Sequence, residues 1–106
     1  MKPFHLIALT VVLAATPVLA ADMLVTQKNK AFSASAIAAR LGQTIYFMNS
    51  DDVNHNITVR YTKEDETDDL GLQKPGEGVS YKFKSAGIYR VICSIHPHMK
   101  LVVTVQ

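Results

Sequence analysis

The stretch GIYRVICSIHPHMKLVVTV, residues 87–105, decides the fold of this 106-residue chain. It contains two runs of strand length, Gly87 to Cys93 and Leu101 to Val105, on either side of a short loop. The second run is apolar almost throughout, which predicts a strand covered on both faces, or one that carries β-propensity without a solvent face. These two runs indicate a β-rich chain.

Five similar runs precede this stretch, and turn signals separate them. Leu41-Gly42-Gln43 and Lys74-Pro75-Gly76 are such signals, because glycine and proline interrupt regular structure. Seven short strands with this punctuation predict an all-β protein, a β-sandwich of about seven strands. The five further runs are Met23 to Gln27, Phe32 to Ile37, Thr44 to Asn49, Asn56 to Tyr61 and Gly78 to Phe83.

Two segments are harder to interpret from pattern alone. Ala31 to Leu41 is rich in alanine and compatible with a helix by propensity, but we predict a strand there. Between Tyr61 and Gly76 no strand is evident, because the segment is strongly acidic. We predict that it forms a loop or a short helical turn.

The first twenty residues, MKPFHLIALTVVLAATPVLA, have the pattern of an export signal. A lysine precedes an apolar stretch, and small residues follow at the point where a signal peptidase would cut. The apolar stretch is too interrupted for a membrane anchor, since a spanning helix needs about 20 apolar residues. We therefore expect a signal peptide over residues 1–20 and one domain over 21–106, which works in the periplasm without membrane insertion.

Charge argues against nucleic acid as a partner. The chain has 11 basic and 9 acidic residues, and removal of the signal takes away one lysine. The net charge of the remaining chain is close to zero, and its sequence shows no basic stripe with interleaved aromatic residues.

The single cysteine, Cys93, needs an explanation in an exported protein. One cysteine cannot form a disulfide within its own chain, and a free thiol is open to oxidation outside the cytoplasm. Cys93 must therefore be buried, paired between chains or bound to a metal. The residues around it favour a metal.

Cys93, His96 and Met99 follow one another at a C-x-x-H-x-x-M spacing. A thiolate, an imidazole and a thioether together favour copper over magnesium or calcium, and a second imidazole completes the donor set of a blue-copper site. His55 can supply it, because it is the one histidine outside both the loop and the signal. Structural zinc sites usually contain two or more cysteines and no methionine.

Over Phe32 to Gln106 the chain resembles the cupredoxins, or blue copper proteins, and within them it is most similar to amicyanin. The likeness rests on the short Cys-x-x-His-x-x-Met loop, the pair His55-Asn56 and the run Gly42-Gln43-Thr44-Ile45-Tyr46-Phe47. The segment from Leu70-Gly71 to Pro75-Gly76 also resembles small plastocyanin-like proteins labelled as methylamine utilisation proteins. The resemblance implies a Greek-key β-sandwich. It also implies one copper ion bound by His55, Cys93, His96 and Met99, with Asn56 hydrogen-bonded near Ser94.

That resemblance implies a monomeric electron carrier rather than an enzyme. Its partners would be redox proteins, such as a c-type cytochrome or a periplasmic dehydrogenase. The alternatives are a periplasmic copper carrier or copper-tolerance protein of the same fold, and a domain that keeps the fold without copper. Ile95, Asn54 and His98 depart from the residues usual at these positions of amicyanin-like chains. We expect His98 to face solvent, although it could compete for metal.

Two further hypotheses concern reactive and charged residues. Cys93 and His96 could act as nucleophile and base of a hydrolase, but no carboxylate that would orient the histidine is legible nearby. The acidic residues in 64–69 are most simply a solvated loop. They could instead dock a basic partner such as a cytochrome.

Overall fold

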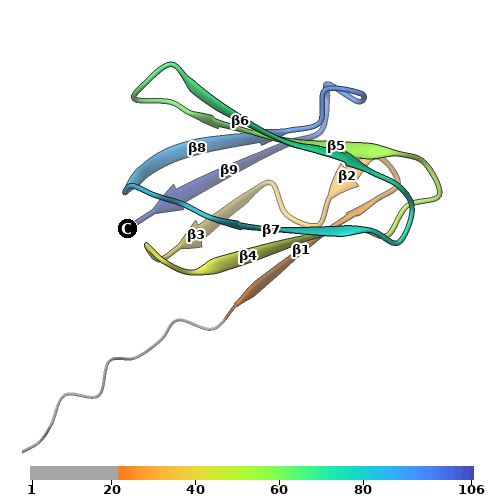
Figure 1. Ribbon diagram of the computed structural model, residues 1–106, viewed down its shortest axis with the longest axis horizontal. Helices are drawn as coiled ribbons and strands as arrows, with labels where there is room; N and C mark the ends of the chain where they lie inside the picture. Colours follow the sequence, from red (N-terminus) through yellow and green to blue (C-terminus); the bar gives the residue numbers. More distant parts are fainter. Residues whose placement is uncertain (1–21) are drawn as a thin grey trace, which may run out of the picture.

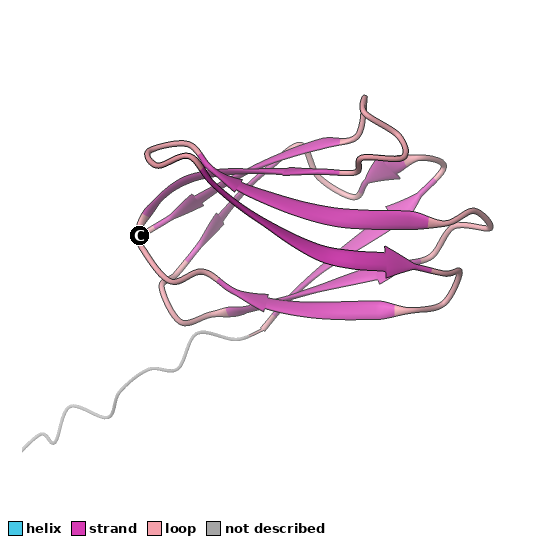
Figure 2. Cartoon of the chain, turned by 45° about the horizontal axis from the view of Figure 1, so that its top comes forward, coloured by secondary structure: helices cyan, strands magenta, loops and turns pink. Residues whose placement is uncertain are grey.

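The computed structural model describes residues 22–106, and every regular element in this range is a β-strand (Figures 1 and 2). The signal peptide predicted for residues 1–20 lies outside the described residues and stays a prediction. The nine strands are β1 (Met23–Lys28), β2 (Ala31–Phe32), β3 (Ala36–Ala39), β4 (Thr44–Asn49), β5 (His55–Tyr61), β6 (Glu66–Gln73), β7 (Gly78–Lys82), β8 (Gly87–Ile92) and β9 (Lys100–Val105). The predicted all-β class is confirmed.

The strands form a sandwich of two sheets. One sheet has the order β2-β1-β4-β7 and the other has the order β3-β9-β8-β5-β6. β1 pairs parallel with β4, and β3 pairs parallel with β9, whereas all the other neighbours are antiparallel. The chain therefore passes repeatedly from one sheet to the other, and the predicted β-sandwich is confirmed.

β6 corrects the prediction that no strand lies between Tyr61 and Gly76. Its sequence, ETDDLGLQ, is poor in β-formers, and most of its side chains are exposed. It occupies the edge of the five-stranded sheet, where only β5 pairs with it. Edge strands carry charge readily because charge discourages pairing with another chain. Hydrogen bonds to β5 thus outweigh the weak local propensity.

The alanine-rich segment and the last strand also depart in detail from the sequence pattern. The segment Ala31 to Leu41 is extended, as predicted, but it divides into β2 in one sheet and β3 in the other. The expectation that β9 is covered on both faces is wrong. Its residues alternate between buried and exposed, and Val102 is 38% exposed. β9 therefore has a solvent face on the outside of the five-stranded sheet.

The core lies between the sheets and follows the two-residue period of the strands. Ile45 and Phe47 of β4 point inward and are fully buried, while Tyr46 and Met48 lie on the other face, as predicted. Ile57, Leu101 and Val103 are fully buried core residues of the five-stranded sheet. Burial of such a side chain contributes about 1.5–3 kcal/mol. This core fixes the ends of the strands to which the functional residues are attached.

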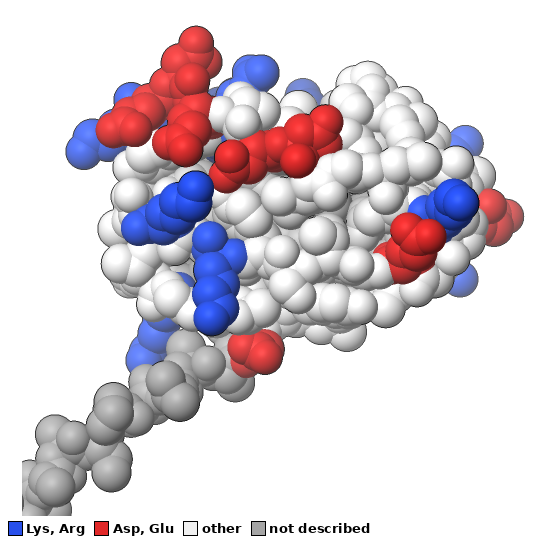
Figure 3. All heavy atoms as spheres, viewed as in Figure 1, with Lys and Arg blue, Asp and Glu red and all other residues white. Residues whose placement is uncertain are grey.

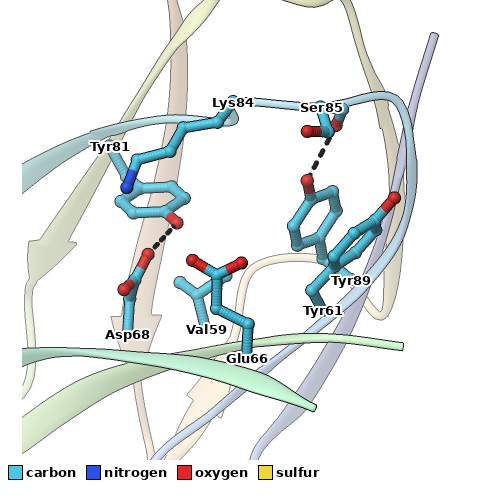
Figure 4. A pocket seen from close by; sticks show the side chains of 8 residues that line it. All are labelled: Val59, Tyr61, Glu66, Asp68, Tyr81, Lys84, Ser85 and Tyr89. Carbon is cyan, nitrogen blue, oxygen red and sulfur yellow. Dashed lines mark hydrogen bonds between the residues drawn. The ribbon is translucent and has the colours of Figure 1, made fainter. Parts of the chain in front are cut away.

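Aromatic side chains close one end of the sandwich, around a hollow of about 30 Å³ (Figure 4). The Tyr61 and Tyr89 rings stack with centroids 4.6 Å apart, and the Tyr89 hydroxyl donates to the Ser85 carbonyl at 2.7 Å. The Tyr81 hydroxyl donates to Asp68 at 2.5 Å. This end holds the last residue of β5 and the start of β8, so it lies opposite the end where His55 and Cys93 are found.

Gly87 and Gly42 provide a matched pair of alanine substitutions. Both have positive φ, +143° and +85°, but an added Cβ at Gly87 would lie 2.8 Å from a ring carbon of Tyr61, whereas the space around Gly42 is open. We expect Gly42→Ala to lower the free energy of unfolding by about 1 kcal/mol through backbone strain alone, and Gly87→Ala by about 2–4 kcal/mol. Urea unfolding measures both. Equal losses would contradict the steric role of Tyr61.

Candidate metal centre

The candidate ligands come from two parts of the chain that the five-stranded sheet brings together. His55 is the first residue of β5, and Cys93 directly follows the last residue of β8. β5 and β8 are antiparallel neighbours, with Thr58 opposite Ile92, so the start of one strand lies beside the end of the other. The loop from Cys93 to Met99 then leads into β9 at this same end of the sandwich (Figure 1).

Three donor atoms meet at this end. The Cys93 Sγ lies 3.7 Å from the His55 Nδ1 and 3.9 Å from the His96 Nδ1, and the two nitrogens are 3.2 Å apart. Among residues 22–106 this is the one group of histidine, cysteine or acidic residues that could hold a metal ion. Cys93 and His55 are 0% exposed, while His96 is partly exposed.

These distances fit a bound metal ion. A triangle with sides of 3.2, 3.7 and 3.9 Å has a circumradius, the product of the sides divided by four times the area, of about 2.1 Å. One point in the plane is therefore at bonding distance from all three atoms. Imidazole and thiolate hold zinc at about 2.0–2.1 and 2.3 Å. Copper takes the same two donor types in a trigonal arrangement.

Met99 closes the loop. Its amide donates to the His96 carbonyl at 3.0 Å, which turns the chain back toward β9, and its side chain is 1% exposed. A buried methionine at the end of this loop suits the weak axial position of a trigonal copper site.

Asn56 connects the two ligand-bearing segments, as the family resemblance implied. Its side-chain Oδ1 accepts a hydrogen bond from the backbone amide of Ser94 at 2.6 Å. The backbone amide of Asn56 donates to the Cys93 Sγ at 3.5 Å. Asn56 is 6% exposed. Since Asn56 follows His55 and Ser94 follows Cys93, these two hydrogen bonds fix the distance between His55 and Cys93. One of them also points an N–H group at the sulfur of Cys93.

Asp51 is a functional residue that the sequence analysis missed. Its Oδ2 lies 3.0 Å from the His55 Nε2, and its side chain is 7% exposed. Hydrogen bonds from the Lys30 amide and from His55 hold the pKa of Asp51 well below its usual range, so this group is a carboxylate and can only accept. The His55 Nε2 therefore carries a proton. A neutral His55 then presents the lone pair of Nδ1 to the metal centre.

The loop histidines differ in their surroundings. Loss of hydration is the main cause that lowers the pKa of His96. The lowered pKa favours the neutral imidazole, which is the form that binds a metal. His98 is exposed, with its ring centroid 6.4 Å from that of His96, and it lies outside the group of three donors. This placement agrees with the expectation that His98 faces solvent.

The interaction of Asp51 with His55 can be tested by substitution. We expect Asp51→Ala to raise the dissociation constant for copper about 10–100-fold, because the ring of His55 loses the group that orients it. Asp51→Asn, which keeps an oxygen acceptor for the Lys30 amide, should have a smaller effect. A competition titration with a chelator measures both, and Asp65→Ala, at an exposed position of the β5–β6 turn, is the control. Unchanged affinity in Asp51→Ala would contradict this role.

The sequence itself also carries a family signature. A profile of copper binding proteins, the plastocyanin/azurin family, matches residues 20–106. The chain belongs to this family. Its cofactor is therefore copper, in agreement with the donor set described above. A search of curated protein sequences finds no match.

Solved structures of the same fold include several forms of amicyanin. A Cu(I) form of a methionine-to-alanine mutant of amicyanin superposes with a TM-score of 0.73 at 20% identity, over 80% of this chain and 82% of that one. A reduced Cu(I) form of a proline-to-glycine mutant of amicyanin at pH 4 superposes with a TM-score of 0.73 at 21% identity. The match covers 85% of this chain and 87% of that one. The expected likeness to amicyanin is confirmed.

A larger copper protein contains the same fold as one of its parts. A Cu-containing nitrite reductase from Thermus scotoductus SA-01 gives a TM-score of 0.71 at 26% identity, over 80% of this chain. The matched region covers 22% of that enzyme's chain.

Proposed function

We propose that His55, Cys93, His96 and Met99 bind one copper ion and that this protein carries single electrons between redox proteins in the periplasm. The observation that supports this most strongly is the triangle of Cys93 Sγ, His55 Nδ1 and His96 Nδ1, whose dimensions place all three atoms at bonding distance from one point. Bound copper supplies one-electron exchange between Cu(I) and Cu(II).

The protein contributes a rigid ligand set. Cys93 and His55 are attached to paired strands, Asn56 joins the two segments, and Asp51 fixes the ring of His55. Ligands held in this way move little when the charge of the metal changes, and a small rearrangement favours fast electron exchange. Of the three donor residues, His96 is the one that is partly exposed, so its ring offers the electron a route to the surface; Ile95, 47% exposed, lies beside it as an apolar contact for a partner.

The geometry disfavours a thiol hydrolase. Asp51, His55 and Cys93 do form a carboxylate–imidazole–thiol series, but its imidazole is that of His55 and not that of His96, the base considered from the sequence. The Cys93 side chain is moreover 0% exposed, and two imidazole nitrogens face its sulfur. A substrate carbonyl therefore has no approach to the nucleophile.

Periplasmic location, a monomeric state and partners such as a c-type cytochrome or a periplasmic dehydrogenase are parts of the same proposal. They are supported by the export pattern of residues 1–20 and by the family's copper centre. Within residues 22–106, no helix is both long enough and apolar enough to cross a bilayer.

Repeated cycles of oxidation and reduction distinguish a protein that carries electrons from one that delivers copper. We expect the copper protein to pass through several cycles with ascorbate and a mild oxidant, and to keep its metal in the presence of a Cu(I) chelator. Both sulfur donors of the proposed site are buried, which suits retention rather than handover. Transfer of the copper to the chelator after the first reduction would contradict electron carriage and favour a copper carrier.

A further inference from the structure

A groove of about 610 Å³ lies on the outer face of the five-stranded sheet, beside the loop that carries the ligands. Arg60 from β5, Arg90 from β8 and Lys100 from β9 contribute three positive charges to its lining. Atoms of Cys93 and Ser94 line the same groove. A positively charged surface therefore adjoins the metal centre.

In the part of the chain that the structure describes, none of the three cations has an anionic partner within 4.0 Å. Among residues 22–106 the one ion pair within 4.0 Å is that between Asp51 and His55. Arg60 and Arg90 are moreover directly opposite each other in the register of β5 and β8, and both are exposed. Like charges at opposite positions of neighbouring strands destabilise a sheet. An anion bound between the two arginines would relieve this repulsion.

The groove also has an apolar component. Ile92, Val102 and Pro97 line it together with the cations, and Val102 is 38% exposed because β9 has a solvent face. Protein interfaces combine an apolar centre with a polar rim, and arginine is enriched in them. The groove has this composition, and no acidic residue is part of its described lining.

We propose that this basic groove is the docking site of an acidic redox partner protein, whose surface carboxylates pair with Arg60, Arg90 and Lys100. The inference rests on the proposed electron carriage and names the chemistry of the partner. One electron passes between the two redox centres, so one is oxidised as the other is reduced, and no bond forms or breaks. Contact with the partner is made at Ser94 and Pro97, next to the buried Cys93.

The acidic end of the molecule is a poorer place for electron exchange. Figure 3 shows acidic side chains gathered where the β5–β6 turn lies, at the end of the sandwich away from the ligand loop. β5 separates this turn from His55, and its seven residues span about 20 Å at 3.3 Å per residue. A basic partner docked there would be a strand length from the metal centre, whereas the basic groove lies directly beside the buried Cys93.

Binding of a hexaglutamate peptide tests the groove directly. We expect titration of ¹⁵N-labelled protein to shift amide signals around residues 60, 90, 92, 94 and 100, with binding that weakens between about 20 and 200 mM salt. Arg60→Glu combined with Arg90→Glu should raise the dissociation constant about tenfold or more. The control is Lys28→Glu combined with Lys82→Glu, which makes the same change of charge at exposed positions of the other sheet. An equal loss in the control, or shifts on another face, would overturn the docking site.

Electron exchange with charged reagents gives a second, functional readout. We expect the Arg60→Glu/Arg90→Glu protein to be oxidised by anionic hexacyanoferrate(III) about tenfold more slowly than the Lys28→Glu/Lys82→Glu control, and by a cationic cobalt(III) phenanthroline complex no more slowly. Because the peptide titration does not depend on copper, the two proposals can fail separately. Peptide binding at the groove without redox-active copper overturns electron carriage alone. Redox-active copper with peptide binding elsewhere overturns the docking site alone.

Discussion

Cys93→Ser removes the intense visible absorption of the copper(II) protein. In the proposed site, this absorption comes from charge transfer between the thiolate of Cys93 and copper, and a serine hydroxyl cannot supply it. We expect the intensity to fall at least about tenfold, and the affinity for copper to fall with it, because a soft anionic donor is replaced by a neutral one. Visible and electron paramagnetic resonance spectra of the two proteins, loaded with equal copper, measure the change.

Two controls make this result specific. Circular dichroism shows whether Cys93→Ser keeps the fold, which we expect because serine is close to cysteine in size. His98→Ala alters the same loop at an exposed residue outside the donor group, so its visible band should be unchanged. A strong visible band that survives in Cys93→Ser would show that the sulfur of this residue is not a ligand.

Phe47→Ala should have the largest effect on stability. Phe47 is among the largest side chains that are 0% exposed, and it lies in the core between the two sheets. Truncation of a buried phenylalanine costs about 3–5 kcal/mol, because apolar contacts are lost and a cavity remains. Natural domains have about 5–15 kcal/mol of stability in total, so the copper-free variant should be largely unfolded or close to it at 37 °C. Thermal and urea unfolding of the copper-free protein measure the loss.

Phe32→Ala serves as the matched control for this substitution. Phe32 is only partly buried at the end of the short strand β2, so the same change should cost about half as much or less. Copper should raise the stability of both variants, because a ligand that binds only the folded chain stabilises it by mass action. Equal losses in the two variants would contradict the placement of Phe47 at the centre of the core.

The candidate ligands could be predicted from the sequence because their residue types carry the chemistry. A thiolate, an imidazole and a thioether at a three-residue spacing limit the choice of metal, and His55 was the one histidine left to complete the set. The structure brings Cys93, His55 and His96 together. The role of Asp51 was not predictable in this way, since Asp52 stands beside it and the sequence does not tell which carboxylate turns toward His55.

The strands followed from local pattern where one face is buried and the other is not. Thr44 to Asn49 alternates clearly, and the predicted and observed bounds of β4 coincide. β6 was missed because its acidic residues have low β-propensity, and the strand forms through its pairing with β5. The covered strand predicted at Leu101 to Val105 has an exposed face, since apolar residues with high β-propensity resemble a buried strand even at the surface.

The basic groove depends on register, which the sequence did not reveal. Arg60 and Arg90 are thirty positions apart and become neighbours only because β5 and β8 pair with these residues opposite each other. Neither arginine belongs to a charged run, and the net charge of the whole chain is only +2. A local concentration of charge can therefore arise from strand pairing in a chain whose composition suggests none.

The copper K-edge X-ray absorption spectrum of the loaded protein tests the central claim most directly. If His55, Cys93 and His96 bind the ion together, the spectrum will show two nitrogen donors of imidazole type and one sulfur donor, all at short distances. A first shell made only of nitrogen and oxygen would place the copper elsewhere and contradict the account.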